Sequence, residues 1–271
     1  MNISSIARIV VLVLSALITL PPLRAADATN APGKPAPATT SSNSGAAVPQ
    51  DMQNALQMPE GKERKSALVK AAVAWEKQDP RAALACILAL PNTPSNNTAV
   101  RPMGNYWGDS DPVAAKDWMV SQYPSLKDGS NELPLLAFHL IITAWARKDP
   151  AAATAWAASQ PDNSPVNSCI YFSMADGFGQ KDPAGAAAWA AKVPVEKSRR
   201  TAVTMAATVW SRSKPEDAAA WAEKLPTADI KSAAPVIATL WGKKDAEKAK
   251  AWVNGLQLSD AEKAEILGKI K

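Results

Sequence analysis

The chain has 271 residues, of which 47% are hydrophobic, and a formal net charge of +5. Arg8 and Arg24 belong to a segment typical of export signals, and without them the net charge is about +3, too low to indicate a nucleic-acid partner. A single histidine and two cysteines outside any CxxC pair exclude zinc sites of the His-x-x-x-His and CxxC kinds. We therefore predict no nucleic-acid partner, no metal and no cofactor.

Residues 1–25 are predicted to be a signal peptide. Arg8 ends a short positive region, and the apolar run over 9–20 is too short to span a bilayer comfortably. Pro21 breaks that run, and the small side chains of Ala25 and Ala26 suit cleavage. The mature protein is thus expected in the periplasm or outside the cell, with no membrane span. The alternative is an uncleaved segment that anchors the chain in the inner membrane.

The stretch that follows the signal is rich in Ala, Pro, Ser and Thr and has almost no large apolar side chain. Such a composition cannot bury enough surface to offset the entropy of ordering. We predict a disordered linker over 26–55 and a helical-repeat domain over 56–271. Residues 51–59 are expected to add a short helix at the start of this domain.

The ten tryptophans occupy two positions that lie eleven residues apart and recur six times. The first aromatic position holds Trp75, Trp107, Trp145, Phe178, Trp210 and Trp241, and the second holds Cys86, Trp118, Trp156, Trp189, Trp221 and Trp252. Successive first positions are 31–38 residues apart. A period of this length, with two anchors per unit, is typical of stacked helical hairpins that bury their apolar faces only against their neighbours. We expect these aromatic side chains to be interior packing, not an exposed binding ladder.

Between the two aromatic positions, most units carry Asp followed by Pro, which is typical of a helix start. The predicted caps are Asp79, Asp111, Asp149, Asp182 and Asp245, while the fifth unit has Lys214 before its proline. After the last unit, Ser259 and Glu262 have the spacing of a capping box. Ser259 is therefore predicted to cap a terminal helix that covers the last repeat.

Helix pairs of about 33 residues, with a small residue in the second helix and a proline after it, resemble the tetratricopeptide-like class of α-helical repeats. The resemblance covers residues 59–256. It implies an all-α fold, a right-handed α-solenoid of about six helix-turn-helix repeats with a C-terminal capping helix. It also implies a concave face that takes peptides or protein segments.

Residues that could carry chemistry are few. His139 lies in an apolar helix and is predicted to be a packed structural histidine, with an acid–base role as the alternative. Cys86 and Cys169 are three repeats apart, beyond disulfide reach in an open stack, so both are predicted to be unpaired. We predict no catalytic, cofactor-binding or metal-binding residue.

Cations cluster between the first aromatic position and the following cap. They are Lys77, Arg147, Lys148, Lys181, Arg212, Lys214, Lys243 and Lys244. One interpretation is that cations favour the carbonyl end of a helix. The other is a basic binding edge, aligned by stacking of the units, for an acidic polymer or protein face.

These features favour an exported, non-enzymatic helical-repeat scaffold that binds protein or peptide. Two alternatives stay open: a carbohydrate-active enzyme of the α/α-barrel type, since six helix pairs could close into a ring, and a purely structural envelope spacer.

Overall fold

The computed structural model describes residues 47–123, 126, 132–161 and 166–270, and this part of the chain contains fourteen helices and no strand. None of these helices combines the length and the apolar character that a membrane crossing needs. The predicted signal peptide and most of the predicted linker lie outside the described residues. Both therefore stay predictions.

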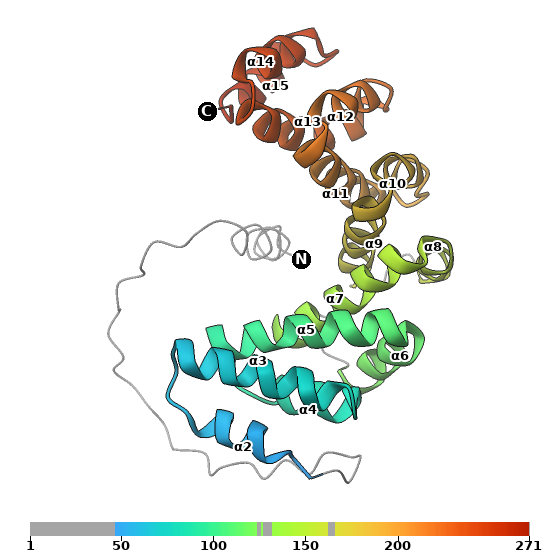
Figure 1. The fold of residues 1–271 in the computed structure, drawn as a ribbon. Coiled ribbons are helices and arrows are strands. Elements are labelled where there is room, and N and C mark those ends of the chain that lie inside the picture. Colours follow the sequence, from blue (N-terminus) through green and yellow to red (C-terminus); the bar gives the residue numbers. More distant parts are fainter. Residues whose placement is uncertain (1–46, 124–125, 127–131, 162–165, 271) are drawn as a thin grey trace, which may run out of the picture. The chain divides into compact units, whose positions relative to one another are not determined.

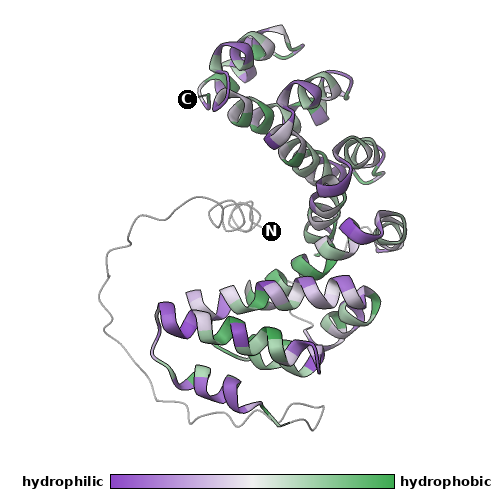
Figure 2. Ribbon diagram, viewed as in Figure 1, coloured by the Kyte–Doolittle hydropathy of each residue, from purple (hydrophilic) through white to green (hydrophobic). Residues whose placement is uncertain are grey.

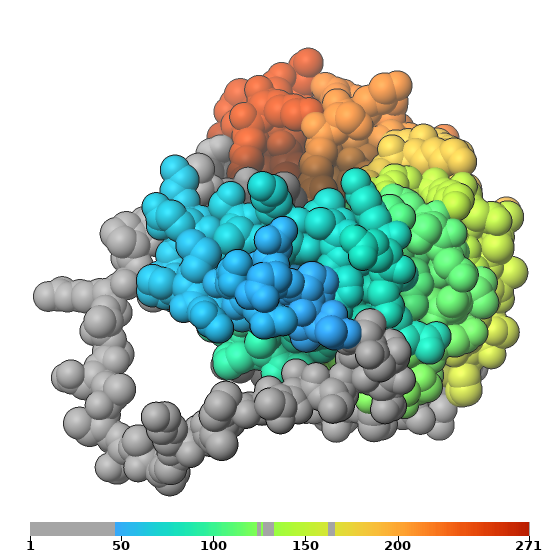
Figure 3. Space-filling model, turned by 60° about the horizontal axis from the view of Figure 1, so that its bottom comes forward, coloured from blue at the N-terminus to red at the C-terminus, as the bar shows by residue number. Residues whose placement is uncertain are grey.

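The folded part begins with α2 (Gln50–Gln57), which packs on α3 (Lys62–Glu76). Met52 and Ala55 of α2 are buried. In Figure 3, α2 lies on the surface of the helices that follow it. This helix overlaps the end of the range 26–55 assigned to the linker, because its two apolar side chains cover the first repeat. The boundary of the folded part therefore lies nearer residue 50 than residue 56.

Six pairs of helices follow α2, and we number them units 1 to 6. The longer first helices are α3, α5 (Pro94–Ser110), α7 (Glu132–Lys148), α9 (Asn167–Lys181), α11 (Glu196–Ser213) and α13 (Thr227–Gly242). The shorter second helices are α4 (Pro80–Leu88), α6 (Pro112–Gln122), α8 (Pro150–Ala158), α10 (Pro183–Ala190), α12 (Pro215–Ala222) and α14 (Ala246–Gly255). The last helix, α15 (Asp260–Leu267), packs on α13 and α14.

The first helices form a row, because each packs extensively on the first helix of the next unit. Each second helix from α4 to α12 contacts the first helix of its own unit and that of the next unit (Figure 1). Hydrophobic residues recur along the helices of this row (Figure 2). In every unit the residues three, four and seven positions before the first aromatic position are buried. The same side of each first helix therefore faces the core.

The aromatic residues join the two helices within a unit. Ring centroids of the paired tryptophans lie 5.3 Å apart in unit 2, 5.6 Å in unit 3, and 6.1 Å in units 5 and 6. In unit 4 the ring that pairs with the second-position Trp189 is that of Tyr171, which stacks on it with the ring centroids 6.0 Å apart. First-position side chains are buried in four units and half-buried at Phe178 and Trp210, while Trp118, Trp156, Trp189 and Trp221 are half-buried. The aromatic pairs thus contribute to the packing of the two helices of a unit, and the second-position rings of units 2 to 5 keep part of their surface exposed.

The Asp-Pro pattern forms the helix starts that it predicts. The Oδ1 atoms of Asp79, Asp111, Asp149, Asp182 and Asp245 each accept the backbone N–H three residues ahead, at 2.9–3.1 Å. Lys214 provides no side-chain cap to α12. Ser259 and Glu262 form the reciprocal capping box at the start of α15. Each second helix is thus held at its first turn by local chemistry, except in unit 5.

Candidate functional site

The predicted basic residues lie at the ends of the first helices and in the turns that follow. We call this strip the C-terminal edge: the residues two to four positions after each first aromatic position. Its members are exposed or half-exposed from Lys77 to Lys244. The helix period places the residue two positions after the aromatic opposite the core-facing positions. The edge therefore borders the side of the row that faces away from the core.

Three lysines of the edge bind the unit before their own. Lys148 Nζ donates to the backbone carbonyl oxygen of Asp109. Lys181 Nζ lies 3.5 Å from the backbone carbonyl oxygen of Lys148. Lys244 Nζ donates to the carbonyl of Arg212 at 2.7 Å. Each accepting carbonyl belongs to the last turn of a first helix, where the helix dipole is negative. These three lysines therefore bind a helix carbonyl end, but it is the carbonyl end of the preceding first helix in the row and not that of their own helix.

One acidic residue neutralises part of the edge. Arg147 donates from Nη2 to both carboxylate oxygens of Asp109, at 2.9 and 3.0 Å, which ties α7 to the end of α5. Arg212 and Lys243 differ, since within the described residues neither side chain makes a hydrogen bond or ion pair. Arg147 is therefore engaged with Asp109, whereas the side chains of Arg212 and Lys243 stay open to a partner.

His139 lies in a buried polar cluster between α7 and α9. Its Nδ1 is 2.8 Å from Ser173 Oγ, and its Nε2 is 3.9 Å from Asp176 Oδ2. Burial lowers the pKa of His139. The nearby Asp176 carboxylate raises this pKa, and the charge of Arg101 lowers it further. Ser173 Oγ is fully buried and donates to the carbonyl of Cys169 at 2.6 Å. Ser173, His139 and Asp176 are thus mostly buried polar groups that lie within hydrogen-bond or ion-pair distance of one another.

The two cysteines are both buried and unpaired, as predicted. Burial raises the pKa of Cys169 to about 12 and also raises that of Cys86. A thiol that stays protonated is a poor nucleophile and metal ligand. Among the described residues, no three acidic, histidine or cysteine side chains come together in a group that could hold a metal ion.

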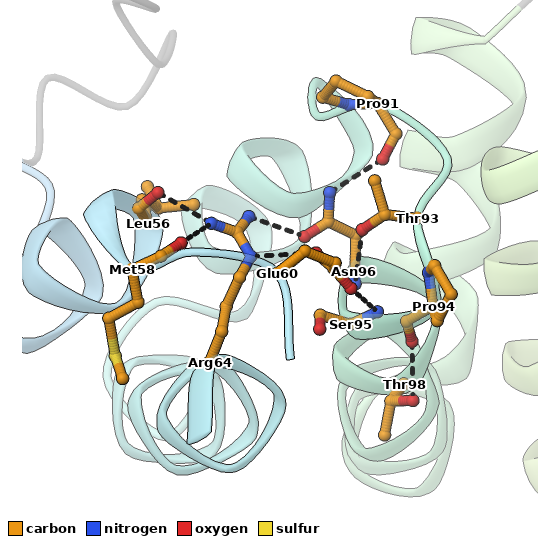
Figure 4. Close-up of polar contacts among 10 residues, drawn as sticks. All are labelled: Leu56, Met58, Glu60, Arg64, Pro91, Thr93, Pro94, Ser95, Asn96 and Thr98. Atoms are coloured by element: carbon orange, nitrogen blue, oxygen red, sulfur yellow. Dashed lines mark hydrogen bonds and ion pairs between the residues drawn. The ribbon is translucent and has the colours of Figure 1, made fainter. Parts of the chain in front are cut away.

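A further repeated position was missed from the sequence. Eleven residues before the first aromatic position stand Arg64, Asn96, Pro134, Asn167, Arg199 and Ile230. Arg64 donates to the carbonyls of Leu56 and Met58 and reaches Asn96 Oδ1 in the next unit at 3.2 Å (Figure 4). Polar residues at four of six matching places, each at the start of an apolar helix, are the signal that could have revealed it.

The same position joins other units. Arg199 Nε donates to Asp229 Oδ2 of unit 6 at 2.9 Å, and the Asp229 side chain is fully buried. The amides of Asn96 and Asn167 each donate at 2.7 Å to the carbonyl of the proline that ends the preceding unit. These contacts hold the start of four of the six first helices, α3, α5, α9 and α11, and engage the two arginines within the chain.

Glu76, at the end of α3, is also buried, with 2% of its surface exposed and no hydrogen-bond partner for Oε1. The residue directly after the first aromatic position is small in every other unit: glycine in three units, alanine in one and serine, Ser211, in one. Burial raises the pKa of Glu76 from 4.5 to about 7, although neighbouring Lys77 lowers it. A carboxyl group with a raised pKa binds its proton more tightly in the folded than in the unfolded state.

We expect Glu76→Gln to be more stable than the wild type above pH 7, by up to about 3 kcal/mol. Wild-type stability should fall as pH rises from about 4.5 through 7, since the unfolded chain then ionises first, and stay level above that window. Free energies of unfolding in urea at about pH 5 and pH 8 measure this. Glu63→Gln, at an exposed place on the same helix, is the control. An equal change for both variants would contradict the assignment.

Comparisons with protein-family models, curated proteins and solved structures give no match to this chain.

Proposed function

We propose that this chain is an exported, non-enzymatic α-solenoid of six two-helix units that binds a protein or peptide segment. The observation that carries the proposal is the one-sided burial of the first helices. The residue two positions after the first aromatic position is not buried in any of the six units. The residue nine positions before the first aromatic position is not buried in five of the six units. We call this side of the row the free face. A row of helices with a free face offers an extended surface for a partner.

The packing favours an open array over a closed barrel. Within the described residues, every extensive contact joins helices of one unit or of adjacent units, with α2 and α15 at the two ends. A ring of helix pairs would need extensive contacts between the first and the last unit. An open row of stacked pairs is the arrangement of the tetratricopeptide-like class that the sequence resembles.

A non-enzymatic role is supported by the buried state of the polar groups. Ser173 and Asp176 are at most 8% exposed, and His139 is 7% exposed, so these groups present little surface to a substrate. Export rests on the signal-like residues 1–25.

Site-specific photo-crosslinking in the cells that make the protein tests the proposal. A photoreactive amino acid is placed at Thr201 or Gln180 on the free face, or at Ala188 or Ala220 on exposed positions of second helices. We expect discrete crosslinked protein products from Thr201 and Gln180 and none from the two alanine positions. Absence of crosslinks from every position would favour the structural spacer, and products from the alanine positions alone would place the partner elsewhere.

A further inference from the structure

The charge of the C-terminal edge changes along the row. In unit 2 the edge carries Asp109 and Asp111 and no cation, and in unit 4 Lys181 is followed by Asp182. Units 5 and 6 together carry four cations and one carboxylate, that of Asp245. The positive charge of the edge is therefore concentrated at the end of the array near α15.

Unit 5 produces this imbalance because a lysine replaces the aspartate cap. Lys214 stands where four other units place Asp before Pro, so one carboxylate is lost and one cation is gained. We call Arg212, Lys214, Lys243 and Lys244 the basic patch. The helix α12 forms without its side-chain cap. Giving up a cap costs about 1 kcal/mol of helix stability, part of which the acidic Glu216 and Asp217 in the first turn of α12 offset.

The cations of the basic patch are only partly used within the chain. Arg212 and Lys243 are exposed and unpaired among the described residues. Lys214 lies 3.9 Å from Asp217 with both side chains mostly exposed, a weak pair. Lys244 donates to the carbonyls of Arg212 and Ser213, which orders the patch and leaves its charge uncompensated by a carboxylate.

We propose that the basic patch binds an extended acidic segment of a partner protein, which rests on the scaffold function proposed above. Adjacent packed helices lie about 8–10 Å apart, and α11 and α13 are adjacent in the row. An extended polyproline-II segment advances about 3.1 Å per residue with three residues per turn. Carboxylates three residues apart therefore lie on one side of the segment at about 9 Å, and meet Arg212 and Lys243 on successive helices.

Binding of fluorescent peptides to the purified full chain tests this, measured by anisotropy. One peptide carries four glutamates, each separated by two small residues, and a second has the same composition with its glutamates contiguous. We expect the spaced peptide to bind more tightly, and its affinity to fall at about 0.3 M salt, because exposed charges are screened. A polyphosphate of similar total charge probes simple attraction to polyanions.

Charge reversal locates the site. The double variant Arg212→Glu with Lys243→Glu should lose about tenfold or more in affinity for the spaced peptide, whereas Lys192→Glu with Lys224→Glu should change it less than about twofold. The control pair makes the same change in net charge at exposed places in the turns directly after the second helices α10 and α12. Circular dichroism checks that both variants keep their helix content.

Equal losses in the two double variants would overturn the proposal, as would preference for contiguous glutamates or for polyphosphate. If the peptides fail while crosslinks from Thr201 and Gln180 persist, the acidic partner is wrong and the scaffold function stands. Loss of those crosslinks removes the scaffold function itself.

Discussion

Gly177→Ala should destabilise the protein by about 2 kcal/mol or more, although alanine is normally the better helix former by about 1 kcal/mol. A Cβ at Gly177 would overlap the carbonyl oxygen of Thr143 in α7 and lie 3.0 Å from Ala146 Cβ. Backbone atoms cannot turn aside as a flexible side chain can, so α7 and α9 must separate along a tightly packed contact. Urea unfolding followed by circular dichroism gives the free energy.

Gly255→Ala is the matched control for this substitution. Gly255 is also helical, at the end of α14, and beyond its own stretch of helix no described atom lies within 4 Å of the place where its Cβ would be. Its replacement should be neutral or stabilise by up to about 1 kcal/mol. If Gly177→Ala is as stable as Gly255→Ala, the close approach of α7 and α9 is not present in solution.

Arg199→Met should cost about 3–5 kcal/mol of stability, because it leaves the buried Asp229 carboxylate without its cation. Asp229 Oδ1 already has no hydrogen-bond partner, so Arg199 supplies the ion pair that holds this charge. The double variant Arg199→Met with Asp229→Leu should recover much of the loss, since it removes the charge together with its partner. Unfolding free energies of the four proteins complete the cycle.

Arg64→Met is the matched control at the same repeated position in unit 1. The groups released there are the neutral carbonyls of Leu56 and Met58 and the amide of Asn96, with only the exposed Glu60 carrying charge. Its cost should be smaller, about 1–3 kcal/mol. Equal losses for the two arginines, or additive effects of Arg199→Met and Asp229→Leu, would contradict a special role for the buried charge.

Short-range features of the chain could be predicted well from sequence. Asp79 caps α4 by bonding a backbone N–H three residues ahead, so its effect depends on nothing outside one helical turn. Trp107 and Trp118 meet within a single helix pair, which the eleven-residue spacing already indicates. The basic edge could be predicted as a set of positions, but not the division between its engaged members and the open cations Arg212 and Lys243.

The sequence by itself determined the all-helical class, the pairing of helices, their capped starts and the aromatic pairs, because each depends on residues within one unit and on the helix period. Only the tertiary structure decided how units meet. Lys244 with the carbonyl of Arg212, Arg199 with Asp229, and Gly177 with Thr143 join residues about thirty positions apart. Such contacts depend on the register between neighbouring helices, which is set by side-chain packing across the row.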